Sequence, residues 1–410
     1  MNDRSIAVLK LKKFDFNSMI QIILFLFIIF MLNLGYYKQI FSSSPSQIAM
    51  LLLCIYSISA LRLKRIINLK HMFFLTIFQV YVLLIHGFSA YEMLSICTIL
   101  LVVLALLNNR FNIELFWSVL DFCAVIATVM IFFQAIIFYV SGTAVDLFPV
   151  SLVDAKRLAE DSSLHLNIVQ NGIIRPAAFF AEPSHYTHFV SPLLIQYMLT
   201  EEKRKVKKKL IIFVSIGVVL STSGMGIVLV AALWIFYVFQ LIYSRKKKYL
   251  LYGICLLVFF IGIFIFFFNN NAYFQKSIVR IFIPSSFSSS AIGGRTAGIE
   301  NMFRMLNGNE VWFGTGEATN RINNGFIGGI FQIIYQNGVL GAILYTCIYL
   351  SSAFKLREGN RWQSLYVILI SFFAGVNNNA YLIYFVFTIY TGFNTVNRTY
   401  DRNNKISCVQ

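Results

Sequence analysis

The sequence predicts an all-α fold: a polytopic integral membrane protein with about twelve transmembrane helices and two large outer loops. Three observations lead to this prediction. Apolar residues come in long blocks, basic residues collect on one set of connecting segments, and the two longest connections belong to the other set. Of the 410 residues, 58% are apolar and 12% are charged, whereas about a quarter of a soluble globular protein is charged.

The apolar blocks define the expected spans. Met19–Leu34, Val119–Val140 and Leu250–Phe268 have few polar interruptions, and about 20 apolar residues cross a hydrocarbon core about 30 Å thick. The blocks lack the alternation of a membrane β-barrel, so helices must satisfy the backbone polar groups. We expect a single transmembrane domain over residues 1–410, with spans at roughly 18–35, 46–61, 72–88, 92–107, 115–140, 185–200, 210–222, 225–243, 249–268, 324–353, 362–376 and 380–396.

The formal net charge of +17 is explained by topology. The terminal segments and every second connection carry 25 of the 34 lysines and arginines and 7 acidic residues. The other connections carry 9 basic and 9 acidic residues, and Asp121 lies within a span. Basic residues favour the cytoplasmic side, so both termini are expected in the cytoplasm, and no basic patch remains for nucleic acid.

Neither a cleavable signal peptide nor a disulfide framework is expected. The first apolar run is long, and no small-residue cleavage site follows it. There is no Cys-x-x-Cys motif, which argues against a zinc site. The cysteines are therefore interpreted as small packing residues; five lie within predicted spans and one in the C-terminal tail: Cys54, Cys97, Cys123, Cys255, Cys347 and Cys408.

Two connections are much longer than the others, at residues 141–183 and 269–323, and both fall on the outer side. Most helix connections are short, and function is commonly carried on loops. Disordered tethers are the alternative, but both loops contain aromatic residues, which disordered segments lack. We expect two ordered, functional periplasmic loops.

The segment Arg175–Tyr186 ends the first loop and reads Arg-Pro-Ala-Ala-Phe-Phe-Ala-Glu-Pro-Ser-His-Tyr. Glu182 followed by Pro183 is typical of a helix start, because proline suits the first helical position and a carboxylate suits the positive end of the helix dipole. Beyond that capping role, Glu182 and His185 stand one turn apart, and such groups are the usual general bases for a hydroxyl. His188 is interpreted as a polar residue packed between helices.

Arginines in both loops are candidates for binding an anion. Arg175 lies in an apolar setting. It is interpreted either as a snorkelling side chain at the membrane interface or as a planar fork for phosphate. Arg295 is the first candidate of the second loop, and Arg280 is a weaker one. Arg304 and Arg321 are expected to pair with glutamates of the same loop.

The second loop also contains an amphipathic stretch at 296–306, followed by Val-Trp-Phe-Gly-Thr-Gly-Glu at Val311–Glu317. Its Gly314-x-Gly316 pair is not followed by the Gly-Lys-Ser/Thr of a P-loop. We interpret it as a tight turn and leave open a main-chain role near an anion.

Three of these segments resemble the O-antigen polymerase (Wzy) group. They are Arg175 with Phe-Phe-Ala-Glu-Pro-Ser, Arg295 followed by Phe313-Gly-Thr-Gly, and Gln-Ile-Ile-Tyr-Gln-Asn-Gly-Val-Leu-Gly at Gln332–Gly341. The resemblance extends to topology over nearly the whole chain. It implies that the arginines of the two long loops, here Arg175 and Arg295, are functional.

The chain departs from the related O-antigen ligases at one point. Many of those relatives carry a His-Asn pair just before the helix that follows the second loop, where this sequence has Asn323-Asn324-Gly325. The departure weakens the ligase interpretation. It leaves the base, if there is one, to Glu182 or His185.

The resemblance implies transfer of a growing glycan from undecaprenyl diphosphate to a sugar hydroxyl of the next lipid-linked repeat unit, at the outer face of the inner membrane. Arg175, Arg295 and Arg280 would stabilise the diphosphate, with Glu182 as base and His185 as orienting group or alternative base. No metal or other cofactor is expected, because neither loop contains an Asp-x-Asp pair. Aromatic rings are expected to pack isoprenoid or sugar faces: Phe179, Phe180, Tyr186 and Trp312.

Two alternatives remain: a ligase or other polyprenol-dependent glycosyltransferase, and a flippase of lipid-linked sugars. A flippase would need ionisable residues within its spans. Asp121 is the only acid clearly inside one, and a flippase leaves the long loops unexplained. The expected partners are the lipid-linked oligosaccharide, the bilayer, and a chain-length regulator and flippase of the same pathway.

Overall fold

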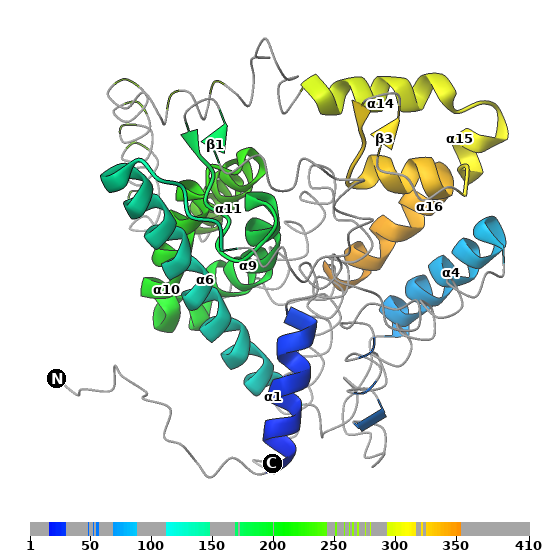
Figure 1. Ribbon diagram of the computed structural model, residues 1–410. Coiled ribbons are helices and arrows are strands. Elements are labelled where there is room, and N and C mark those ends of the chain that lie inside the picture. Colours follow the sequence, from blue (N-terminus) through cyan, green and yellow to red (C-terminus); the bar gives the residue numbers. More distant parts are fainter. Residues whose placement is uncertain are drawn as a thin grey trace, which may run out of the picture.

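The computed structural model describes residues 16–29, 69–87, 112–147, 169–170, 173–199, 201–243, 293–316, 321–322 and 325–353, together with a few isolated positions. These residues are predominantly helical, with two small hairpins (Figure 1). The helices are α1 (Phe16–Ile29), α4 (Leu69–His86), α6 (Ile113–Ser141), α9 (Pro183–Met198), α10 (Glu201–Leu220), α11 (Gly224–Tyr243), α14 (Gly293–Met305), α15 (Asn309–Phe313) and α16 (Ile330–Ala353).

Each hairpin consists of two antiparallel strands of two residues. In the first, β1 (Val169–Gln170) pairs with β2 (Ile173–Ile174), and Val169 lies opposite Ile174. In the second, β3 (Arg321–Ile322) pairs with β4 (Gly325–Phe326), and Arg321 lies opposite Phe326. The first hairpin lies in the predicted loop 141–183, whereas the second crosses the end of the predicted loop 269–323, since β4 falls at the start of the predicted span 324–353.

Two helical segments are long and apolar enough to cross a membrane, Glu114–Ser141 and Ile330–Ile348. Helices α1, α4, α9, α10 and α11 coincide with five further predicted spans. The predicted spans at 46–61, 92–107, 249–268, 362–376 and 380–396 lie outside the described residues. The total of twelve spans and the placement of the termini therefore stay predictions.

The long helix α6 has one apolar side exposed and another buried. A stripe at spacings of three and four residues is exposed: Phe122, Val125, Val129, Phe133, Ile136 and Val140. A second stripe has no exposed surface and faces the core: Leu120, Ala124, Ala127 and Ile131. Soluble proteins rarely expose so long an apolar strip, whereas lipid covers such a surface without cost. This pattern supports a membrane-associated protein.

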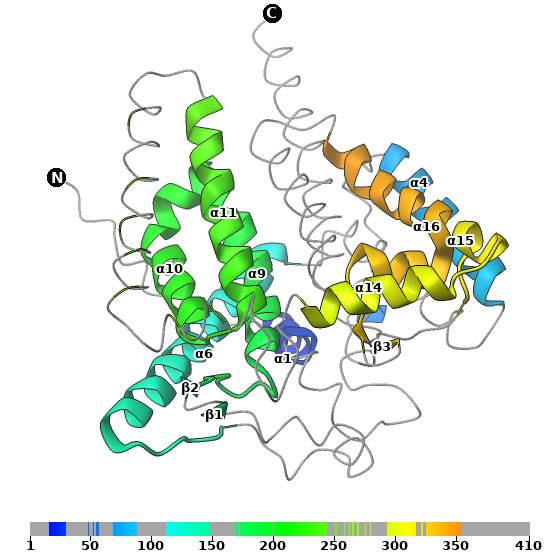
Figure 2. The same cartoon turned by 90° about the horizontal axis from the view of Figure 1, so that it is seen from above.

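Contacts divide the described helices into two groups (Figures 1 and 2). In the first group α6 packs against α1, α9 and α10, and α9 also packs against α11. In the second group α16 packs along α4 and against α15, and α14 packs on the β3–β4 hairpin. The chemistry discussed below lies at the start of α9 and at a break in α16.

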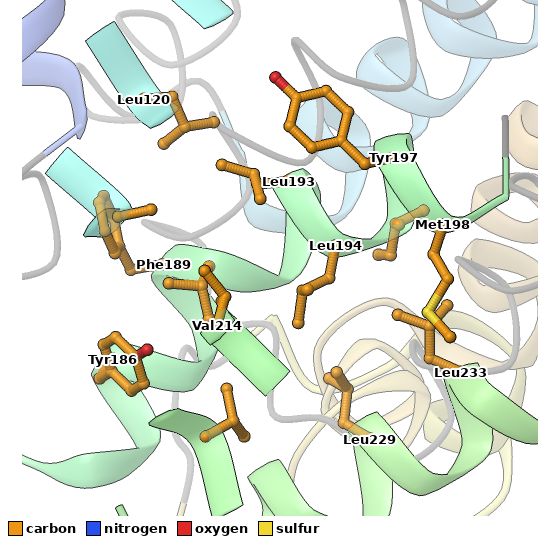
Figure 3. Close-up of a cluster of buried hydrophobic side chains, with 14 of the residues drawn as sticks. Leu120, Tyr186, Phe189, Leu193, Leu194, Tyr197, Met198, Val214, Leu229 and Leu233 are labelled. Carbon is orange, nitrogen blue, oxygen red and sulfur yellow. The ribbon is translucent and has the colours of Figure 1, made fainter. Parts of the chain in front are cut away.

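Helix α9 is the centre of the first group, because side chains on all its faces are buried. Figure 3 shows Leu193 and Leu194 of α9 among residues of α6, α10 and α11, such as Leu120, Val214 and Leu229. A helix with buried side chains on every face belongs inside a bundle. The position of the α9 start is therefore fixed by packing on several neighbours.

Three helix boundaries differ from the sequence prediction. Helix α10 begins at Glu201, well before the predicted 210, with a kink at Lys207. Its first turns are rich in lysine and glutamate, which are good helix formers outside the membrane. Helix α16 begins at Ile330 instead of 324 and has a non-helical residue at Gly338. The predicted amphipathic stretch 296–306 belongs to α14, which begins earlier, at Gly293.

Candidate functional site at the start of helix α9

Glu182 and Pro183 begin helix α9, as the sequence predicts. Glu182 is extended, with φ −142° and ψ 151°, and Pro183 occupies the first helical position. The Glu182 side chain makes no capping hydrogen bond to the backbone. Its Oε2 instead accepts a hydrogen bond from the Ser184 hydroxyl at 2.9 Å. The carboxylate therefore lies at the positive end of the helix dipole without being required to form the helix.

A strained turn leads into this helix start. Ala178 has φ +53°, a left-handed conformation that is costly for a residue with a Cβ atom. The turn is closed by the Phe180 N–H, which donates to the Ala177 carbonyl at 2.9 Å. Arg175 precedes the turn and Glu182 follows it. The turn thus determines where both charged side chains lie.

The side-chain amide of Gln134, in the C-terminal third of α6, holds this turn. Its Oε1 accepts from the Ala178 N–H at 2.8 Å, and its Nε2 donates to the Ala178 carbonyl at 3.3 Å. The same Nε2 donates to the Val145 carbonyl at 2.9 Å. Gln134 is only 2% exposed. The sequence contains one signal for this role: Gln134 is a polar residue inside the apolar block Val119–Val140.

Arg175 is partly buried and interacts electrostatically with Glu182. Burial lowers the pKa of the Arg175 guanidinium, and the Glu182 carboxylate opposes that shift. An arginine side chain keeps its charge in either case, because its pKa lies so high. The structure thus brings together Arg175 and Glu182, two of the residues that the sequence singles out.

His185 and His188 extend the polar surface along the first two turns of α9. Both side chains are partly buried. Positions three residues apart lie on the same face of a helix, so Glu182, His185 and His188 form one row. The row supplies a carboxylate and two imidazoles next to a guanidinium, which are groups capable of proton transfer and anion binding.

Two of the aromatic side chains expected to contact substrate lie in the protein core instead. Phe180 is 1% exposed and Tyr186 is 0% exposed. The Tyr186 hydroxyl forms a hydrogen bond with that of Thr128 at 2.8 Å, and the Phe180 ring packs on Phe189, with 5.2 Å between ring centroids. Their rings are enclosed because α9 is central to the bundle, so in this structure no face of either ring is open to a sugar or an isoprenoid.

The other two aromatic candidates remain accessible. Phe179 is partly buried and lies against Phe180, with 4.7 Å between ring centroids. Trp312, in α15, is 54% exposed. These two rings are the ones that keep surface for contact with a ligand.

Further contacts attach the first loop to the same end of the bundle. The Thr222 hydroxyl, in the turn between α10 and α11, donates to the carbonyl of Ile174 in β2 at 3.2 Å. That turn is the Ser221-Thr-Ser segment, and Ser221 and Ser223 are buried. The β1–β2 hairpin, Arg175 and the start of α9 therefore form one compact polar end.

The opposite end of this bundle has its own charged group. Asp121 of α6 forms an ion pair with Lys207 at 2.7 Å and accepts a hydrogen bond from the Tyr197 hydroxyl at 2.7 Å. Asp121 and Gln134 are separated by about 20 Å along α6, given a rise of about 1.5 Å per residue. Between these two levels of α6 lies the buried hydrogen bond of Thr128 with Tyr186, among mainly apolar side chains.

In the second group, the Trp312-Phe-Gly-Thr-Gly segment binds the break in α16. The N–H groups of Thr315 and Gly316 donate to the carbonyls of Tyr335 and Gln336 at 2.9 and 3.0 Å. The Gly314 N–H donates to the Glu310 carbonyl at 2.7 Å. These donors are thus used within the protein, so the structure does not support the main-chain anion site left open for this turn.

Helix α4 contributes polar side chains to the same break. The Tyr81 hydroxyl donates to the Asn337 carbonyl at 2.7 Å, and His86 Nε2 lies 2.9 Å from the Asn337 Oδ1. No sequence pattern connects His86 with Asn337, which are 251 residues apart, so this cluster could not be predicted. It shows that the break is built from buried backbone groups with partners, as a helix interruption in an apolar region requires.

The arginines of the second loop are spread over several elements. Arg295 lies in the first turn of α14, Arg304 is exposed in its last turn, and Arg321 lies in β3. Arg280 lies outside the described residues. Helix α14 runs with its first turn toward the α9 group and its last turn toward α15 (Figures 1 and 2). Arg295 is thus at the end of α14 that lies toward the α9 group.

Comparisons with known proteins identify no family: no protein-family model and no curated protein matches this chain. Within the described residues, no group of three or more histidine, cysteine, aspartate or glutamate side chains could hold a metal ion. The geometry around Arg175 and Glu182 is therefore the main indication of function.

Proposed function

We propose that this chain is a polysaccharide polymerase of the O-antigen or capsule type, located in the bacterial inner membrane with both termini in the cytoplasm. It would transfer a growing glycan from undecaprenyl diphosphate to a sugar hydroxyl of the next lipid-linked repeat unit. The observation that carries the proposal is the pair of Arg175 and Glu182 on one turn, at one polar end of an apolar helical bundle.

The proposed reaction assigns a role to each of these groups. The acceptor hydroxyl oxygen attacks the anomeric carbon, and its proton passes to the Glu182 carboxylate, with His185 as orienting group or alternative base. The bond from the anomeric carbon to the diphosphate oxygen breaks. Negative charge that develops on the departing diphosphate is stabilised by Arg175 and, from the second loop, by Arg295 and Arg280.

A substrate that arrives from the bilayer fits the surroundings of this site. The exposed apolar stripe of α6 runs past the level of Gln134, which holds the turn at Ala178, so an isoprenoid chain in the lipid can lie along the same helix. A chain-length regulator and a flippase of the same pathway are the proposed protein partners.

The structure offers less support for a flippase. Such a protein needs ionisable groups along a path through its spans. Asp121, the acid inside span 115–140, is engaged by Lys207 and Tyr197. A ligase would use similar chemistry and differs in its product, so it remains the alternative that the experiment below must separate.

The test is incubation of the purified protein with lipid-linked repeat unit, followed by sizing of the glycan. Wild-type protein should give a ladder, whereas Arg175→Ala should give single repeats, with a loss of about 100-fold or more, because positioned charge stabilisation contributes that much. Arg175→Lys keeps the charge but loses the planar fork and should recover little. Arg304→Ala, an exposed arginine of α14, is the matched control and should retain the ladder.

Two outcomes would contradict the proposal. A full ladder from Arg175→Ala would remove this arginine from the site. If the wild-type protein moves finished polymer to a different acceptor and does not extend lipid-linked repeats, the ligase alternative is correct.

A further inference from the structure

The turn at Ala178 is held by an unusual number of contacts from one distant side chain. The Gln134 amide contacts both the N–H and the carbonyl of Ala178, and it also contacts the carbonyl of Val145. One side chain thereby joins the C-terminal third of α6, the beginning of the first loop and the end of that loop.

The backbone at Ala178 is not one that this sequence adopts on its own. A left-handed conformation costs an alanine about 1–2 kcal/mol relative to the right-handed one, and strained residues persist only where the surroundings impose them. Glycine would adopt φ +53° with little cost, yet the chain has alanine there. The turn is therefore stabilised from outside, and Gln134 is the side chain that contacts its backbone on both sides.

The location of the turn gives the contacts between Gln134 and the Ala178 backbone a function. Ala178 lies three residues after Arg175 and four before Glu182. If the turn relaxed to an ordinary conformation, the chain direction between these two charged residues would change. A shift of about 1 Å in a group that contacts a reacting centre can reduce a rate by about 100-fold.

We infer that Gln134 is a positioning residue, which fixes Arg175 relative to Glu182 through the backbone of Ala178. The inference rests on the proposed function for its effect on catalysis. Its geometric part, the placement of Arg175, does not depend on what the site does.

Three substitutions separate positioning from a general effect on stability. Gln134→Leu keeps the volume but removes both the donor and the acceptor. Gln134→Glu keeps the acceptor for the Ala178 N–H, and it regains a donor for one carbonyl only when its carboxyl group is protonated. Thr128→Val is the matched control, because it removes an equally buried hydrogen bond of α6, the one to Tyr186, without contacting the turn.

The catalytic readout is polymer formation by the purified protein. Gln134→Leu should lower kcat by about 100-fold while KM changes by less than about threefold, and Thr128→Val should stay within about threefold of wild type. The activity of Gln134→Glu relative to wild type should rise about tenfold as the pH falls from about 8 to about 6, because burial favours the protonated carboxyl. A Thr128→Val loss equal to that of Gln134→Leu, or a flat ratio for Gln134→Glu, would overturn the inference.

A second readout is independent of catalysis. Phenylglyoxal modifies accessible arginines, and mass spectrometry reports the rate at Arg175. Gln134→Leu should raise that rate about tenfold, because the turn opens locally, whereas Thr128→Val should not. An unchanged rate would refute the positioning role even if the protein proved not to be a polymerase. An increased rate in a protein that extends no glycan would refute the proposed function alone.

Discussion

Among the described glycines, Gly338, at the break in α16, is the one where an added methyl group should destabilise the structure most. Its φ of +67° and ψ of −178° are restricted almost entirely to glycine. A Cβ atom there would overlap the carbonyl group of Trp312 and lie 2.5 Å from the Phe313 nitrogen. All these neighbours are backbone atoms, so no side chain can rotate away and relieve the clash.

The expected cost of Gly338→Ala follows from these contacts. The backbone conformation alone costs about 1–3 kcal/mol. The clash forces the Thr315–Gly316 backbone away from α16, and the two hydrogen bonds to Tyr335 and Gln336 contribute about 0.5–1.5 kcal/mol each. We expect a total near 4 kcal/mol, mostly as local opening of this contact.

Hydrogen exchange at the amides of Thr315 and Gly316 measures that opening directly. A loss of about 4 kcal/mol corresponds to exchange about a thousandfold faster in a peptide covering this segment. Gly142→Ala is the matched control, since Gly142 also has positive φ, +72°, but a Cβ atom there would meet nothing within 4 Å. It should accelerate exchange at its own amide only about tenfold, because the conformational cost is about 1 kcal/mol.

A third variant, Gly314→Ala, tests the contact between residues 312–316 and the break in α16 from its other side. A Cβ atom on Gly314 would overlap the Gln336 carbonyl and lie 2.5 Å from the Asn337 nitrogen. Because both glycines serve the same contact, the double variant of Gly314 and Gly338 should be little worse than either single one. Exchange in Gly338→Ala no faster than in the Gly142 control, or fully additive effects in the double variant, would refute this reasoning.

Other predictions concern the first helix group. Lys207→Met should destabilise the protein by only about 1 kcal/mol, because the Lys207 side chain of the ion pair is 40% exposed. Adding Asp121→Leu should restore most of this loss in thermal unfolding, and failure to do so would mean that the pair contributes little. Tyr186→Phe should cost about 1 kcal/mol through the lost Thr128 hydrogen bond, yet leave polymer length unchanged. A shortened polymer would contradict a purely structural Tyr186. Trp312→Ala should raise KM with little change in thermal stability, because the ring is 54% exposed; an unchanged KM would exclude it from substrate contact.

Features of the chain that depend on neighbours in sequence could be predicted. The span at 115–140 agrees with α6, which runs from the Asn112 cap to the Gly142 cap. The start of α9 at Pro183 follows from the local preference of proline for the first helical position. The tight turn at Gly314 and Gly316 was also expected, and both residues have positive φ.

Features that depend on distant residues could not be predicted. Phe180 and Tyr186 were expected at the substrate, but both rings are buried: the periodicity of α9 turns Tyr186 into the core, and the turn that precedes α9 buries Phe180. The interrupted α16 reads as a continuous apolar segment, and the break becomes visible only when Trp312–Gly316 and Tyr81 bind its carbonyl groups. Gln134 looked like an isolated polar residue, although its partners lie at Val145 and Ala178.

The sequence by itself thus determined a helical, apolar chain, several helix ends and the residue types available for chemistry near position 182. These depend on composition, on periodicity and on preferences of single residues, which act over a few neighbours. The tertiary structure decided which of those residues share a site, which rings are enclosed and where a helix breaks. Those outcomes depend on hydrogen bonds and van der Waals contacts between segments up to about 250 residues apart, and only folding brings such segments together.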